Sequence, residues 1–142
     1  MGQNLETIRE AYDAFAKGDI PTVLAAMDPQ IDWREPESIP FDSQLGPDAV
    51  LQNIFAVLPT VFDDFSLEVL ELIDAGDVVL SVGVYHAVGK ATGETLRADF
   101  AHVWRLGADG KIIGFRTYTD THLWRKVLGV DEQEAQPSGS PT

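Results

Sequence analysis

The amino-acid sequence predicts a single α+β domain, with helices in the first part of the chain and an antiparallel sheet in the second. As far as residue 58, with one short interruption, apolar residues recur at three- and four-residue spacing, as on the buried face of a helix. From Phe65 onward they alternate with period two, as they do in a strand. This segregation is typical of an α+β fold. A sheet that curves around such helices leaves a concave, mostly apolar cavity, where small molecules commonly bind.

Three helices are predicted before the sheet. The first spans residues 5–17, and its buried face carries Leu5, Ile8, Tyr12 and Phe15. Asp19 caps the second helix, which ends at Asp28-Pro29. The third begins at Gly46-Pro47-Asp48 and ends before Pro59, and its buried face carries Val50, Leu51, Ile54, Phe55 and Leu58.

A short strand is predicted at residues 31–35, between the second and third helices. Its odd positions place Glu35 in the same phase as two large apolar side chains, Ile31 and Trp33. Residues 37–45 have no clear period, so we expect a loop there that forms a lip of the cavity.

Four further strands form a meander, at residues 65–73, 78–88, 95–106 and 111–122. The last two are joined by a hairpin turn with an Asp-Gly signal, at residues 107–110. One face of the strand at 95–106 is apolar and is formed by Leu96, Ala98, Phe100, Trp104 and Leu106. His102 falls on that same face, and an imidazole in this position predicts where the pocket lies. A last short helix is predicted at residues 123–128.

The composition fits one globular domain at residues 1–128 and a tail at residues 129–142 that we expect to be disordered. A formal net charge of −13 argues against nucleic-acid or anionic-membrane binding, since both require a basic patch. The chain has no cysteine and its 3 histidines show no ligand spacing, so no disulfide, metal site or cofactor is predicted. It shows no signal peptide and no apolar run of about 20 residues, which predicts a cytoplasmic protein.

Several motifs, in this order along the chain, resemble the nuclear transport factor 2-like superfamily, in particular its SnoaL-like (polyketide cyclase) and ketosteroid isomerase-like members. They are AYDAFAKGD at 11–19, IDWREP at 31–36, GPDAV at 46–50, AHVWR at 101–105, DGKI at 109–112 and YTD at 118–120. The resemblance implies a cone-shaped α+β barrel, with three N-terminal helices packed in a strongly curved, mainly antiparallel sheet around an apolar cavity. It also implies a homodimer through the outer face of the sheet, which carries Arg97, Asp99 and Arg105.

The resemblance also implies roles for single residues. Glu35, a carboxylate just before a proline on the first strand, matches the general base of the ketosteroid isomerases. His102 matches their protonated aspartate, and it also resembles the histidine that lies beside an acid–base aspartate in the polyketide cyclases. Thr117 stands where that aspartate would be, which puts cyclase or epoxide-hydrolase chemistry of the family type in doubt. The isomerase tyrosine falls near Ala11, so Tyr12 matches it with a shift of one residue.

Glu35 and His102 each have a structural interpretation beside the functional one. In an apolar pocket the pKa of Glu35 would rise, which suits a general base or acid, whereas a salt bridge at the mouth would make it structural. His102 either lines the pocket or is a core histidine bonded to a backbone carbonyl.

The remaining polar residues of interest are interpreted as structural. His86 shares its strand phase with valine and leucine residues, and His122 ends a strand. Asp120 alternates away from Phe115 and Thr117, so we expect it to pair with an arginine or to cap the final helix.

Two hypotheses about function remain open. In the first, the chain is a cofactor-free isomerase, lyase or cyclase acting on a small, mainly apolar carbonyl compound. Glu35 moves a proton, His102 stabilises the oxyanion, and Tyr12 and Thr117 assist with hydrogen bonds. The expected substrate contacts are Tyr12, Trp33, Phe55, Phe100, Trp104, Phe115, Thr117 and Thr119. In the second, the chain is a non-catalytic small-molecule-binding or dimeric assembly module.

Overall fold

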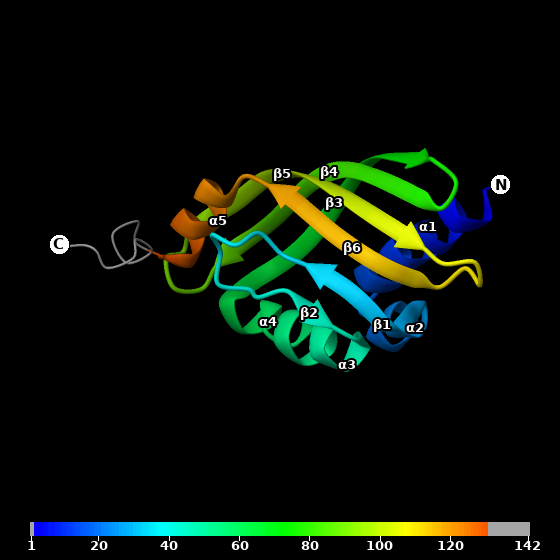
Figure 1. Cartoon of the computed structure of the whole chain (residues 1–142). Coiled ribbons are helices and arrows are strands. Elements are labelled where there is room, and N and C mark those ends of the chain that lie inside the picture. Colours follow the sequence, from blue (N-terminus) through cyan, green and yellow to red (C-terminus); the bar gives the residue numbers. More distant parts are fainter. Residues whose placement is uncertain (1, 131–142) are drawn as a thin grey trace.

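The computed structural model describes residues 2–130 and has an α+β fold (Figure 1). Its elements are, in order, α1 (Gln3–Ala16), α2 (Ile20–Ala25), β1 (Met27–Arg34), β2 (Gln44–Leu45), α3 (Pro47–Val50), the π-helical turn η1 (Leu51–Phe55), α4 (Leu58–Val61), β3 (Phe62–Asp74), β4 (Val78–Gly89), β5 (Thr95–Leu106), β6 (Ile112–Thr119) and α5 (Thr121–Leu128). The predicted order of two helices, a short strand, a helical segment and a four-stranded meander is confirmed.

A six-stranded sheet forms the body of the part that the structure describes, in the order β2-β1-β6-β5-β4-β3. β1 and β6 run parallel, and every other pair within it is antiparallel. The sheet is strongly curved and open, with β2 and β3 as its two edges, and Figure 1 shows α1 and α5 near opposite ends of it. Register shifts in β3, at 63–66 and 69–71, add to its twist and help it to wrap. The architecture is thus an open cone.

The second predicted helix is shorter than expected, because β1 already begins at Met27. Asp28 and Pro29, predicted to end the helix, lie inside the strand. Pro29 has no N–H group to offer a sheet partner, and it falls where the pairing of β1 with β6 is interrupted, between Met27 and Asp32. The cap is as predicted: the side chain of Asp19 accepts a hydrogen bond from the backbone N–H of Thr22.

The third predicted helix is split into α3, the π-helical turn η1 and α4. Pro59, predicted to lie beyond the helix, sits in the first turn of α4, where its missing N–H leaves no hydrogen bond unmade. The preceding loop is less open than the sequence suggests. Ile39 and Phe41 are buried, and the loop ends in β2, which pairs with β1.

The last predicted strand ends earlier than residue 122, because Asp120 starts a helix. Its carboxylate accepts a hydrogen bond from the backbone N–H of Leu123 at 3.3 Å and so caps α5, one of the two structural roles predicted for it. His122 therefore lies in α5. Gly129 closes this helix, and the predicted disordered tail lies outside the described residues from position 131 onward.

On β4, the alternating set of residues with more large apolar side chains faces away from the cavity. The sequence pattern does not reveal this orientation. The cavity side carries Val79, Ser81, Gly83, Tyr85 and Ala87, and the other phase forms the outer face with Val78, Leu80, Val82, Val84, His86 and Val88. Gly83 fits this arrangement, because a Cβ there would lie 2.6 Å from Cζ of Phe100 on β5. His86 places Nε2 2.8 Å from Oε1 of Glu68 on the outside, in agreement with its structural interpretation.

On β5 the predicted apolar face is confirmed. Its residues, including His102, are buried, whereas Arg97, Asp99 and Arg105 are exposed on the outer face. Among residues 2–130, no helix is long and apolar enough to cross a membrane. The cytoplasmic location stays a prediction.

Candidate active site

The concave side of the sheet holds a cavity of about 70 Å³ with mostly aromatic walls. Seven residues predicted for the site line it: Tyr12, Trp33, Glu35, Phe55, His102, Trp104 and Phe115. The three remaining predicted residues lie behind its surface. Phe100 stacks on the His102 ring at a centroid distance of 4.0 Å, and Thr117 is buried beside Tyr85. Thr119 donates to the backbone carbonyl of Asp99.

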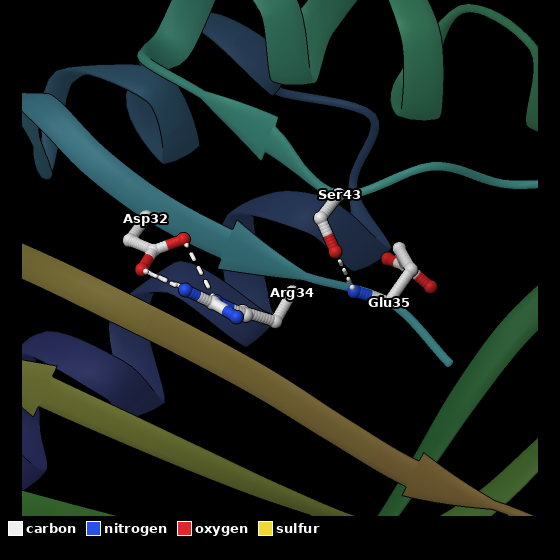
Figure 2. A network of polar contacts seen from close by, with 4 residues as sticks. All are labelled: Asp32, Arg34, Glu35 and Ser43. Atoms are coloured by element: carbon white, nitrogen blue, oxygen red, sulfur yellow. Dashed lines mark hydrogen bonds and ion pairs between the residues drawn. The ribbon is translucent and has the colours of Figure 1, made fainter. Parts of the chain in front are cut away.

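Glu35 follows the end of β1 and brings a carboxyl group to the cavity. Oε2 accepts a hydrogen bond of 2.7 Å from the indole Nε1 of Trp33, two residues earlier. The backbone N–H of Glu35 donates to Oγ of Ser43 at 3.0 Å, which ties the end of β1 to the loop over the cavity (Figure 2). Figure 2 also shows the ion pair of Asp32 and Arg34 as a separate contact, so Arg34 does not neutralise Glu35.

Burial raises the pKa of Glu35 from 4.5 to about 7, and the hydrogen bond from Trp33 offsets only part of this rise. The residue as a whole is partly exposed. Its carboxyl group, where the charge resides, lies among the apolar side chains of the cavity, and these surroundings control its ionisation. Near pH 7 the group therefore exists as both acid and base, as the functional interpretation of Glu35 requires. No ion pair involving Glu35 is present among residues 2–130.

His102 lies between two tyrosines. Nδ1 is 2.6 Å from the hydroxyl of Tyr12 on α1, and Nε2 is 2.7 Å from the hydroxyl of Tyr85 on β4. The Tyr85 hydroxyl is also 2.9 Å from Oγ1 of Thr117 on β6. Side chains from a helix and three strands thus form one chain of hydrogen bonds, and both ring nitrogens of His102 are engaged by phenols.

Trp104 and Ser81 complete this network at the Tyr12 end. Nε1 of Trp104 donates to the Tyr12 hydroxyl at 3.0 Å and to Oγ of Ser81 at 3.3 Å. The Tyr12 and Ser81 hydroxyls are themselves hydrogen-bonded to one another. Tyr12 is thus hydrogen-bonded to His102 within a larger network than the sequence indicates.

The network is uncharged at neutral pH. Burial lowers the pKa of His102 from 6.5 to about 3, so the imidazole is neutral. Burial likewise raises the pKa of the Tyr12 and Tyr85 hydroxyls, so both are phenols rather than phenolates. The site therefore combines a neutral hydrogen-bond network with one carboxyl group of nearly neutral pKa.

Glu35 and His102 do not form a hydrogen bond within the described part of the chain. Tyr85 interacts with both residues. Its hydroxyl is hydrogen-bonded to Nε2 of His102, and the charge of Glu35 contributes to raising its pKa. Sequence reasoning missed Tyr85 and Ser81, because both lie on the phase of β4 that carries fewer large apolar side chains. The signal that would have found Ser81 is the register, which pairs it directly with His102.

No group of three or more His, Cys, Asp or Glu side chains among residues 2–130 is placed to hold a metal ion.

Comparison with known families identifies this arrangement of helices and sheet. The family described as SnoaL-like domain matches residues 8–115. The chain belongs to the SnoaL-like family. The predicted superfamily and the cone-like α+β fold are thereby confirmed, and the family match covers every predicted site residue except Thr117 and Thr119.

Solved structures agree with this assignment. An NTF2-like protein of unknown function from Burkholderia pseudomallei K96243 is 30% identical, with a TM-score of 0.82, and the match covers 90% of this chain and 98% of that one. An NTF2-like protein from Burkholderia thailandensis E264 is 31% identical, with a TM-score of 0.83 and coverage of 96% and 100%. TerC, co-crystallised with polyporic acid, is 28% identical, with a TM-score of 0.80 and coverage of 89% and 98%. No curated protein matches the chain.

Proposed function

We propose that this SnoaL-like chain is a cofactor-free enzyme of the isomerase, lyase or cyclase type, which moves a proton on a small, mainly apolar carbonyl compound. The observation that carries this proposal is the carboxyl group of Glu35 at an aromatic cavity, with a pKa of about 7. A general base is most effective when its pKa lies near the working pH, because it can then both take up and return a proton.

The hydrogen bonds suggest how Glu35 would act. Among residues 2–130, Trp33 is the one side chain that donates to its carboxyl group, at Oε2. Oε1 is then the oxygen that takes a proton from the carbon next to the substrate carbonyl. The negative charge that develops on the carbonyl oxygen would be stabilised by the neutral network around His102. Because the cavity walls are apolar, such hydrogen bonds are stronger there than in water.

A non-catalytic small-molecule-binding module is the second candidate. It is favoured by Thr117, which stands where related enzymes carry an acid and which bonds only Tyr85 among the described side chains. TerC was co-crystallised with an organic compound, and this supports a small organic ligand under either candidate.

Proton exchange distinguishes the two candidates. Small aromatic and alicyclic ketones are incubated with the protein in deuterium oxide, and the loss of the α-proton signal is followed by NMR. An enzyme of the proposed type speeds the exchange of at least one ketone that also binds. Ketones that bind but exchange only at the uncatalysed rate would support the binding module.

We also propose that the chain forms a homodimer through the outer face of the sheet. Large apolar side chains are exposed there, among them Val82 at 37%, Ile113 at 43% and Tyr118 at 51%. Charges of both signs surround them, including Glu68 on β3 and Arg116 on β6. A second copy related by a two-fold axis could pair opposite charges around a shared apolar centre.

The dimer is tested by placing a charge at its centre. Val82→Glu is expected to convert a dimer into a monomer, since the buried carboxylate would lack a partner. Light scattering at micromolar concentration measures the mass. Leu45→Glu is the matched control, because Leu45 is 74% exposed on the edge strand β2, and its mass should stay that of the wild type. A wild-type monomer would contradict the proposal.

A further inference from the structure

We infer that Tyr85 is the residue that donates a hydrogen bond to the carbonyl oxygen of the ligand, while His102 behind it orients the Tyr85 proton. This inference rests on the proposed carbonyl ligand and adds a donor that lies on β4. Tyr85 lines the cavity, and its side chain is buried apart from that surface. His102 itself has no ring nitrogen to spare, since both are engaged by tyrosine hydroxyls.

The argument begins with the protons of the network. Its members form a chain of contacts in the order Ser81, Tyr12, His102, Tyr85 and Thr117. Four hydroxyl groups and one neutral imidazole supply five protons, whereas there are four contacts between them. Each contact uses one proton, so one hydroxyl proton is left over.

The leftover proton can belong to any of the four hydroxyl groups. If every group donates toward Ser81, with the ring proton on Nδ1 of His102, the Ser81 proton is left over. If every group donates toward Thr117, with the ring proton on Nε2, the Thr117 proton is left over. If both neighbours of Tyr12 or of Tyr85 donate to it, the proton of that tyrosine is left over. Ser81 and Thr117 are buried, with exposures of 0% and 4%, and neither hydroxyl has an acceptor for a leftover proton among residues 2–130. A buried hydroxyl proton without an acceptor costs free energy.

A ligand acceptor at Tyr85 removes this leftover proton. Tyr85 then donates to the ligand, and its oxygen accepts from both Nε2–H of His102 and the Thr117 hydroxyl. Every proton in the chain then has an acceptor. The network is therefore better satisfied with a carbonyl ligand than without one.

The same role at Tyr12 is less favourable. If Tyr12 donated to the ligand, its oxygen would have to accept from His102, from Ser81 and from Trp104, which are three donors for two lone pairs. The 3.0 Å bond from Trp104 would have to be given up. Tyr85 has no such competing donor among the described residues. The charge of Glu35 also helps to raise its pKa. A ligand held by Tyr85 is thus near the proposed base.

Two probes of the same shape test the inference by binding alone. Acetophenone carries a carbonyl oxygen, and α-methylstyrene has a CH₂ group in its place. Binding is followed by tryptophan fluorescence, because all 3 tryptophans of the chain line the cavity. We expect the wild type to bind the ketone about tenfold more tightly than the alkene, as for one hydrogen bond gained in an apolar site.

Tyr85→Phe is expected to abolish this preference and leave alkene binding in place. Tyr118→Phe removes a hydroxyl from the outer face, where the side chain is 51% exposed, and should keep the preference. A preference that survives in Tyr85→Phe, or that only Tyr12→Phe removes, would overturn the inference. A wild type that does not prefer the ketone, or does not bind it, would overturn it as well.

A second measurement does not depend on a variant that folds. The ¹⁵N chemical shifts of the His102 ring report which nitrogen carries the proton. With acetophenone bound, the ring is expected to be in the Nε2–H form, and a bound ring in the Nδ1–H form would contradict the inference. Neither measurement uses turnover, so a chain that binds ketone through Tyr85 but exchanges no proton would contradict the proposed enzymatic function alone.

Discussion

Glu35→Gln is expected to reduce the rate of catalysed α-proton exchange by about 10²-fold or more, because an amide cannot take up the proton. Glutamine has nearly the same shape and keeps an oxygen that can accept from the Trp33 indole, so the cavity is preserved. Exchange of the ketones that bind the wild type is measured by NMR under saturating conditions. Unchanged exchange in the variant would remove Glu35 from the mechanism.

The matched control is Glu37→Gln, which removes an exposed carboxylate two residues away. It should exchange ketones at the wild-type rate. If both variants lose activity equally, the loss reflects the net charge at the mouth of the cavity.

The stability of Glu35→Gln follows from the same pKa. In the folded chain Glu35 keeps its proton up to about pH 7, whereas in the unfolded chain it releases the proton near pH 4.5. Its raised pKa therefore costs the wild type stability as the pH rises from 4.5 to 7. The glutamine variant should be more stable than the wild type by about 1–3 kcal/mol at pH 8 and nearly equal to it at pH 4. If Glu35→Gln loses activity while its free energy of unfolding increases, the buried carboxyl group serves function at a cost in stability.

His102→Ala is expected to destabilise the fold by about 3–5 kcal/mol in urea denaturation at pH 7. The ring is buried, stacks on Phe100 and contacts Phe115 edge-on at 4.8 Å, so its removal leaves a void in the core. The hydroxyls of Tyr12 and Tyr85 lose the partner between them at the same time. Both effects lower the free energy of unfolding of the variant.

His86→Ala is the control, because His86 lies on the outer face, where its side chain is 37% exposed. We expect a loss within about 0.5–1 kcal/mol for it. A His102→Ala variant that is no less stable than His86→Ala would contradict the buried network.

Acid provides an independent check on His102. The unfolded chain takes up a proton near pH 6.5, whereas the folded chain takes it up only near pH 3, so the wild type loses stability as the pH falls between these values. His102→Ala lacks this loss. The difference in free energy of unfolding between the wild type and His102→Ala should therefore decrease as the pH falls.

Much of the fold can be predicted from local patterns. The alternation in β5 is clear, since the charged residues Arg97, Asp99 and Arg105 share the phase opposite to the large apolar ones, and it places His102 on the buried face. Asp19 and Asp120 cap helices through short-range hydrogen bonds that a sequence can indicate. Such features depend on neighbours in the chain.

The parts that could not be predicted depend on contacts between distant segments. In β4 both phases are largely apolar, so the alternation does not tell which one faces the cavity, and Tyr85 was missed for this reason. The close approach of Gly83 to Phe100, a contact across the sheet, is consistent with the orientation seen. Likewise, the strand position of Pro29 depends on a gap in the pairing of β1 with β6.

The pKa of Glu35 tests the central claim most directly. The carboxyl ¹³C resonance of Glu35, assigned as the signal that Glu35→Gln removes, is followed by NMR from pH 3 to pH 10. A midpoint near pH 7, well above the usual 4.5, is the predicted result. It would establish a carboxyl group that exchanges its proton at neutral pH inside an aromatic cavity. A midpoint near 4.5 would show a solvated carboxylate and contradict the proposed acid–base role.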